Sequence, residues 1–572
     1  MRKLMLLVAI VLLIAVGGLA VIAFNFDSYL NDNRDWIAEQ AEATLGRSVS
    51  FGEARISLQG GLSVRVADLR IGDDPAFASD PFVSADAIDL RVSIMPALFG
   101  NIEIGRIVLQ SPSITVIKTA RGMSTDSLGG DSQPSSKAEQ GESAPDSEVP
   151  EFLVSMIDIR NGTLRYVDKT AKPAAEQTIG RLDLRASNVS LSGPVGLDLK
   201  AAILDSDQQN IRIVAEVIDP ENPTATFTVT SNRISLAPDG ADEFRDLELK
   251  GKLDASKGAP QIDATLKSPK GSVGGATYAD LAVAFNLRDQ VATIERLSAR
   301  AFDGEIEVSG RYDLRNASRP SFDLRSKLSG MRVEQLASSN SAKSDGSIQG
   351  ELGAQLDLVG SGADWDQIKQ TLRGKGGLQL VEGTLKDVNL ADSSLQAVTG
   401  VPGLSNLLPP QLRNDYPQVF GVGDTVFEKM DAKIDVRDGF AYLRDFRLAA
   451  RDYAITGNGR CSLDKRLDMT TVMAFSEALS ERLVESAGPM QYLRSPTGRV
   501  EIPVKLIGTL PEVKTVPDVG YIAKAASRQA VGKLLTDALG GSDDESDASP
   551  TPTTESAAKD LLNKGLGGLF GK

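Results

Sequence analysis

A period-two alternation of apolar and polar residues narrows most strongly what this chain can fold into. The alternation recurs through most of the 572 residues, in short segments that are separated by Gly, Asp, Asn and Pro. Side chains of successive strand residues point to opposite faces of a sheet, so each segment predicts a β-strand with one apolar and one polar face. We therefore expect a mainly β protein with about 25 to 30 strands.

The strands are expected to form a long sheet rather than a closed globule. Similar Gly-containing steps, interpreted as turns between paired strands, recur at residues 160–164, 381–385 and 437–440. Such repetition is typical of elongated architectures. Side by side at ~4.8 Å per strand, the strands would span on the order of 120 to 140 Å, as an upper estimate.

The alternation leaves two architectures open. In a β-sandwich, two apolar faces bury each other and no surface remains for a ligand. In a trough, one long sheet bends around its apolar face, which then lines a groove where acyl chains can lie. A scarcity of helices in the middle of the chain and an aromatic content of only 5% favour the trough. The candidate groove-lining residues are Ile211, Ile213, Val217, Phe227, Val229, Leu281, Val283, Phe285, Leu287, Ile306, Val308, Leu352, Leu356 and Leu358.

An uncharged apolar run from Leu4 to Phe24 predicts a transmembrane helix, because 21 residues at ~1.5 Å per residue match a hydrocarbon core of about 30 Å. Arg2 and Lys3 precede the run and acidic residues follow it, which places the N-terminus in the cytoplasm and the rest of the chain outside. A cleaved signal peptide is the alternative, although this run is longer than usual signal cores. The anchor residues are Leu4, Leu7, Ile10, Leu13, Ile14, Leu19, Ile22 and Phe24.

Composition argues against most enzyme classes and against nucleic acid as a partner. The chain has no histidine and only one cysteine, Cys461, so it lacks a His-dependent triad, a zincin site and an intrachain disulfide. Its net charge of −15 offers no basic footprint. We expect no cofactor and no metal, and acidic pairs on a solvated sheet are expected by chance, which leaves a carboxylate-dependent hydrolase as a remote option.

Helices are expected before Gly46 and over residues 521–540. Two more are expected around residues 390–398 and 476–492, where they would plug or cap the end of the sheet.

The chain is expected to divide into seven segments. The segments are a cytoplasmic stub with its anchor (1–25), a first β region (26–121), a disordered linker (122–150), a repetitive β body (151–373), a second β region (374–520), an amphipathic helix (521–540) and an acidic disordered tail with an apolar tip (541–572).

Two stretches resemble the AsmA family of envelope proteins. Residues 44–74 and 85–122 carry Gly46-Arg47, Leu98-Phe99-Gly100 and Ser111-Pro112 in the order of the family's N-terminal region, and residues 374–518 resemble its C-terminal region. The resemblance implies a single inner-membrane anchor, a periplasmic β body in a Gram-negative-type cell, and kinship with bridge-like lipid carriers that are built as a hydrophobic β trough.

The combined expectation is a non-enzymatic protein that carries phospholipid along its groove between the inner and outer membranes and so supports the outer membrane. Its partners would be the inner membrane, phospholipids, and an outer-membrane surface or a protein at the C-terminus. The alternative is a structural or regulatory factor in outer-membrane protein assembly that acts through exposed strand edges without carrying lipid.

Overall fold

A computed structural model shows a mainly β chain with a few short helices. The structure describes residues 31–57, 62–78, 80–92, 104–126, 154–189, 193–219, 223–236, 240–256, 259–340, 347–399, 410–421, 423–510 and 512–518. Within these ranges all 26 strands belong to one sheet, which excludes a sandwich of two sheets for this part of the chain.

The first half of the sheet extends from the N-terminal strands to the middle of the chain. Its strands are β1 (Val49–Ser50), β2 (Ala54–Ser57), β3 (Leu62–Gly72), β4 (Pro81–Val92), β5 (Ile104–Gln110), β6 (Ser113–Thr119), β7 (Gly122–Met123), β8 (Val154–Asp168), β9 (Ala175–Val189), β10 (Val195–Ala202), β11 (Ile211–Asp219), β12 (Thr224–Ser235), β13 (Glu243–Asp254) and β14 (Gln261–Val273).

The second half contains longer connections that carry helices. Its strands are β15 (Ala276–Arg288), β16 (Val291–Ala301), β17 (Gly304–Asp313), β18 (Ser321–Arg332), β19 (Ile348–Ser361), β20 (Arg373–Leu385), β21 (Thr425–Arg437), β22 (Phe440–Ala449), β23 (Tyr453–Ser462), β24 (Arg466–Phe475), β25 (Glu501–Thr509) and β26 (Glu512–Pro517). The helices within the described ranges are α2 (Arg34–Leu45), α4 (Val333–Asn340), α5 (Trp365–Thr371), α6 (Leu390–Thr399), α7 (Pro410–Asp415), α8 (Pro417–Phe420), α9 (Glu477–Ser486) and the 3₁₀ helix η1 (Gly488–Leu493).

Nearly every strand pairs antiparallel with the next one along the chain, as predicted. Parallel pairing among the described strands occurs only at β8, which lies parallel to β5 and β6. Those two strands lie end to end on either side of Ser111 and Pro112, and each of their paired residues faces the residue 50 positions later in β8. The connection between β6 and β8 is therefore a crossover and not a hairpin.

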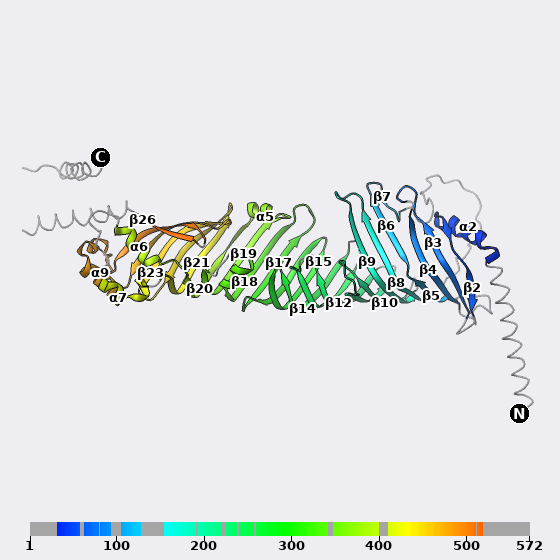
Figure 1. The fold of residues 1–572 in the computed structure, drawn as a ribbon, viewed down its shortest axis with the longest axis horizontal. Coiled ribbons are helices and arrows are strands. Elements are labelled where there is room, and N and C mark those ends of the chain that lie inside the picture. The colour runs from blue at the N-terminus through cyan, green and yellow to red at the C-terminus, as the bar shows by residue number, and fades with distance from the viewer. Residues whose placement is uncertain are drawn as a thin grey trace, which may run out of the picture.

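The sheet is the long axis of the molecule (Figure 1). There are fewer positions across the sheet than strands, because β1 and β2 both pair with β3, and β5 and β6 lie end to end. The two-residue strand β7 pairs only with the last residues of β6. Pairing leads from β2 to β26 in 22 steps, or ~105 Å at ~4.8 Å per step, which is below the length expected from strand count alone.

Several strands bend at β-bulges, where a residue with left-handed backbone interrupts the register. Asn161 (φ 50°), Asp280 (φ 52°), Glu382 (φ 49°) and Asp445 (φ 51°) are such positions. Opposing polar side chains accept the freed backbone N–H at two of them. Bulges increase the local twist and so help a long sheet to curve into a trough.

These bulges correct two of the three predicted turns. Residues 160–164 and 381–385 lie inside β8 and β20, because the left-handed residue in each is accommodated as a bulge within a continuing strand. Only the third step is a turn, in which Asp438 (φ 53°) and Gly439 (φ 77°) join β21 to β22. The resulting hairpin has the backbone twist that two-residue connections favour.

The helices agree with the prediction at three places. Helix α2 ends at Gly46, whose left-handed backbone (φ 65°) lets its N–H donate to Glu42 O. Helix α6, and α9 with η1, occupy the two predicted insertions. Helices α4, α5, α7 and α8 were not predicted.

Several predicted segments fall wholly or partly outside the described residues. No helix within the described ranges is long and apolar enough to cross a membrane, and the anchor predicted at Leu4 to Phe24 lies outside them. The predicted linker begins with β7 and the buried Ser124, while its residues 127–150 are not described. The predicted C-terminal helix and tail also lie outside the described residues.

Candidate functional site

One face of the sheet carries a nearly continuous apolar row from β2 to β25. Each member of the row lies directly opposite the next member on the neighbouring strand, so all of them share one face. Only a serine and two glycines interrupt the apolar side chains, and none of the members is charged. The row is Ala54, Val66, Ile88, Leu109, Ile159, Leu184, Leu199, Ile213, Val229, Leu249, Leu266, Val283, Leu297, Val308, Ser326, Leu356, Gly376, Ile434, Leu443, Gly459, Met469 and Leu506.

All fourteen candidate lining residues lie on this face. Ile213, Val229, Val283, Val308 and Leu356 belong to the row itself. The others occupy parallel rows of the same face, which are linked by pairs such as Leu287 with Ile262 and Leu328 with Ile306. Each of the fourteen side chains is half-buried, neither enclosed nor fully exposed. The apolar face of the middle sheet is therefore a surface and not a core.

The middle of the sheet has almost no fully buried apolar residues. Between β8 and β19 the buried apolar residues among those described are Ala186, Ala201, Ala202, Ala264 and Met331. Four of these five are alanines, whose short side chains are covered by their larger neighbours. Over β9 to β18 no second layer of described residues packs on the face, so acyl chains could reach it directly there, whereas at β19 Leu352 already packs against the buried C-terminal cluster.

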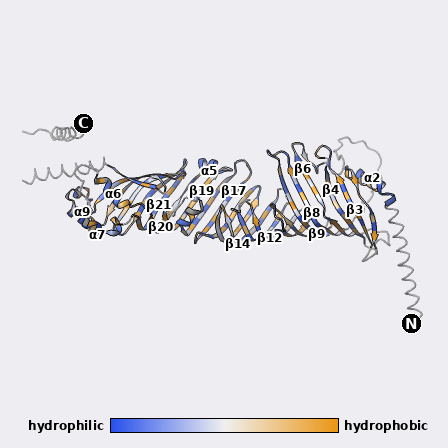
Figure 2. Ribbon diagram, in the orientation of Figure 1, coloured by the Kyte–Doolittle hydropathy of each residue, from blue (hydrophilic) through white to orange (hydrophobic). Residues whose placement is uncertain are grey.

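The opposite face is polar and charged. In β14, Asp263, Thr265 and Lys267 are exposed, while Leu266 between them is half-buried on the apolar face. Ion pairs connect neighbouring strands along the polar face, for example between Arg212 and Asp198 (2.9 Å) and between Arg296 and Glu307 (3.1 Å). Apolar and polar residues alternate along the strands from one end of the sheet to the other (Figure 2).

Aromatic rings on the apolar face lie flat against glycines of the next strand. Phe227 lies opposite Gly251, and a Cβ at that glycine would be 2.6 Å from Phe227 Cζ. Phe322 and Gly360 repeat the arrangement with the same distance. Because the rings fill the space that a side chain would take, they lie along the sheet and leave the floor of the trough even.

Helices cover the apolar face at the C-terminal end. We use the name C-terminal cap for residues 386–399, 410–421, 423–424 and 476–500, which carry α6 to α9 and η1 between strands of the sheet. Leu395, Leu479, Leu483 and Met490 of the cap have no exposed surface. They belong to one large cluster with sheet residues such as Met473, which is also fully buried.

Burial changes the acidity of two side chains near the cap. The pKa of Tyr453 is raised to about 12, mainly because burial disfavours its anion. The same effect raises the pKa of the Cys461 thiol, which is half-buried on the apolar face of β23. Neither group has the depressed pKa of an activated nucleophile.

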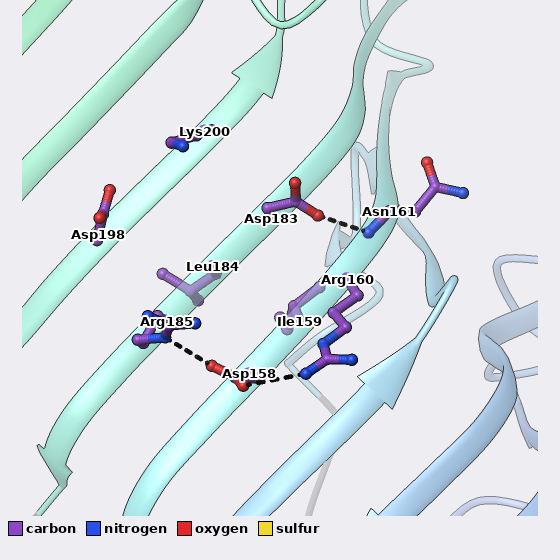
Figure 3. A pocket seen from close by; sticks show the side chains of 9 residues that line it. All are labelled: Asp158, Ile159, Arg160, Asn161, Asp183, Leu184, Arg185, Asp198 and Lys200. Atoms are coloured by element: carbon purple, nitrogen blue, oxygen red, sulfur yellow. Dashed lines mark hydrogen bonds and ion pairs between the residues drawn. The ribbon is translucent and has the colours of Figure 1, made fainter.

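A hollow of ≈ 460 Å³ lies on the polar face at β8 to β10 (Figure 3). Asp158 is its best-buried residue and accepts hydrogen bonds from Arg106 and from Arg185 Nε (3.2 Å), with Arg160 at 3.8 Å. Burial and the nearby arginines lower the pKa of Arg106. Asp183, Asp198 and Lys200 complete the charged lining, so its carboxylates and cations balance and the cluster acts as a cross-strand ion-pair network.

Groups of side chains that could hold a metal ion do not occur among the described residues.

The sequence prediction missed members of the apolar row outside its fourteen residues, including Leu109, Leu184, Leu249 and Leu297. These residues carry the same alternation and could have been found from it, because they stand at period-two positions within their strands. The predicted anchor residues remain untested, since they lie outside the described part of the chain.

The comparison with protein families agrees with this architecture. The model of the AsmA family matches residues 1–261 and 245–446, which together make up more than half of the chain. No curated protein and no solved structure matches the sequence. On the strength of the family match, the chain belongs to the AsmA family.

Proposed function

We propose that this protein carries phospholipid along the apolar face of its sheet, between the inner and the outer membrane, without catalysing a reaction. The observation that carries the proposal is the uncharged, largely apolar row, whose side chains stay half-exposed over the middle of the sheet. An acyl chain on this face would be stabilised by ~0.8 kcal/mol for each buried methylene, while its head group stays in water at the rim.

Movement along the face requires no catalytic group. Adjacent row members such as Leu266, Val283 and Leu297 present similar aliphatic surfaces, so an acyl chain would find neighbouring positions of similar energy. The proposed setting is a single N-terminal anchor in the inner membrane of a Gram-negative-type cell, with the sheet in the periplasm. The proposed partners are the two membranes and phospholipid, with a membrane or protein contact at the C-terminus.

Photocrosslinking in cells tests the proposal. A photoreactive amino acid at Val283 lies on the apolar face, and the same group at the adjacent Ala284 lies on the polar face as a matched control. With radiolabelled phosphate in the medium, we expect labelled phospholipid to crosslink to the chain at position 283 and not at 284. Equal labelling at both positions, or none at either, would contradict lipid carriage.

A charge substitution separates this function from an assembly factor that acts through strand edges. Val283→Asp with Phe285→Asp places two carboxylates in the path of the acyl chains. Loss of outer-membrane integrity in cells with a folded variant supports carriage. Full activity of that variant would favour the assembly factor, because strand pairing at an edge does not depend on the apolar face.

A further inference from the structure

The apolar face continues beneath the C-terminal cap, where its surface is no longer accessible. A second row of direct cross-strand pairs leads from Leu352 through Leu380, Met430, Leu448, Ile455 and Met473 to Ile502. Leu352 is half-buried, whereas the last three members have no exposed surface. The change occurs along a single face of a single sheet, so the cap must cause it.

The cap occupies the position that acyl chains would need. Its helices come from the β20–β21 and β24–β25 connections, and both groups pack into the same buried cluster as the sheet residues. Leu395 of α6 and Leu479 and Leu483 of α9 are completely enclosed there. Protein interiors of this kind are close-packed, so an acyl chain could enter only if these side chains left.

Buried hydrogen bonds fasten the cap to the sheet at both connections. Leu390 N donates to Thr425 Oγ1 (2.9 Å), and Thr425 Oγ1 donates to Val388 O (2.6 Å). At the other connection, Phe475 N of β24 donates to Val500 O (3.0 Å), and both residues are fully buried. Opening the cap would leave these buried groups without partners, which makes it a fixed part of the fold and not a hinged lid.

We infer that the trough is blind at its C-terminal end: acyl chains occupy the face as far as β19 and the edge of β20, and enter or leave over a rim rather than through that end. This inference rests on the proposed function and limits where its ligand can lie. Val308 and Leu356 are half-buried members of the first row before the cap, and Ile434 and Leu443 of that row stay half-buried beside the covered part.

Met473 and Ile502 lie beyond the limit, in the row that the cap covers completely.

Mapping with a photoactivatable phospholipid tests the inference on the unaltered full-length chain. The chain is placed in phosphatidylethanolamine and phosphatidylglycerol vesicles that contain a phospholipid with a diazirine near the end of one acyl chain. After illumination, crosslinked residues are identified by mass spectrometry. We expect crosslinks on the apolar face between β9 and β19, for example at Val308, and only background at Ile455, Met473 and Ile502.

Two other outcomes would overturn the inference in distinguishable ways. Crosslinks at Met473 and Ile502 with a yield equal to that at Val308 would show that lipid passes beneath the cap, and lipid carriage would stand. An absence of crosslinks along the whole face, including Val308, would remove the proposed function and the blind end together. Since no residue is substituted, a folding defect cannot produce either result.

Discussion

The stretches β10–β19 and β20–β26 belong to one sheet and share one apolar face, yet only the second has a core. Both alternate with period two, and the same rows of cross-strand pairs pass through both. Between β10 and β18 the connections are mostly short turns, whereas the later sheet has two long connections that fold back as helices. The comparison teaches that the connections, and not the strands, decide whether an apolar face becomes core or surface.

The two stretches also differ in what stabilises them. Backbone hydrogen bonds and cross-strand side-chain pairs hold the middle of the sheet together. Each side-chain pair contributes about 0.2 to 1 kcal/mol. The C-terminal end adds a cluster of fully buried aliphatic and aromatic side chains. Truncation of a buried Leu or Met there should cost about 2 to 5 kcal/mol. The middle of the sheet and its C-terminal end should therefore not unfold as one unit.

The largest expected effect is that of a charge placed in each stretch. Met473→Asp buries a carboxylate without a partner, which costs several kcal/mol and should unfold the cap. Val283→Asp should leave the fold intact, because its half-exposed face lets the carboxylate keep water. Hydrogen exchange of the two variants measures both effects. Global unfolding by Val283→Asp would contradict the claim that only the C-terminal stretch has a core.

Truncation of one leucine in each stretch should give a smaller difference in the free energy of unfolding, again with the larger loss at the C-terminal end. Leu479→Ala in α9 empties a fully enclosed site and should lower the free energy of local unfolding by about 2 to 5 kcal/mol. Leu266→Ala in β14 should cost less than about 1.5 kcal/mol, because that side chain is only half-buried in the folded chain. The free energies come from denaturant-dependent hydrogen exchange, and equal losses would mean that the middle face is covered as well.

A third prediction concerns the junction between the stretches, at two adjacent glycines of β20. A Cβ at Gly376 would lie 1.9 Å from Gln355 O, so Gly376→Ala must push β19 and β20 apart and should cost about 1 to 3 kcal/mol. Gly377→Ala is the matched control, because its Cβ would lie 3.6 Å from Ala432 O, an ordinary contact. Loss of amide protection in β19 and β20 in the first variant only would support this account; similar protection in both would contradict it.

The smallest expected effect is on the reactivity of a thiol. Burial raises the pKa of Cys461, so less thiolate is present at any pH below that pKa and alkylation should be slow. Its rate should increase with pH and reach half its maximum at a higher pH than in the unfolded chain. A cysteine introduced as Val308→Cys in a Cys461→Ser background should react faster with maleimide. The reverse order of rates would indicate that the face near the cap is the more open one.

Much of this architecture could be predicted from the alternation alone. The strands and the face of all fourteen candidate residues follow from period two, because strand geometry leaves no freedom in where alternate side chains point. The choice between trough and sandwich does not follow from it, because residues such as Val283 and Phe285 would show the same period-two pattern in either architecture. Only the absence of a partner face among the described residues settles that question.

Other features escaped prediction for local reasons. Asn161 and Glu382 each stand next to a glycine and were interpreted as turns, but a left-handed residue in a strand can equally be a bulge. The helix at Val333–Asn340 is a single short segment without a marked apolar stripe, and it forms where the strand ends against β19. The extent of the cap depends on which side chains meet across distant connections, as Leu395 and Leu483 do within one cluster, and no local pattern encodes this.

The single parallel step between β6 and β8 has a consequence for how the chain folds. From β8 to β20 each strand finds its partner nearby in sequence, so pairing can spread from strand to strand with little loss of chain entropy. At the parallel step, by contrast, Ser113 must meet Thr163 across a closed loop of fifty residues. The step should be slow to form, because the entropy of closing the loop is lost before the pairing is gained. Loop closure costs only ~0.6 kcal/mol more for each doubling of length, so the connection should tolerate insertions. The strands before β8 are thus expected to join the sheet after the strands from β8 to β20 have paired.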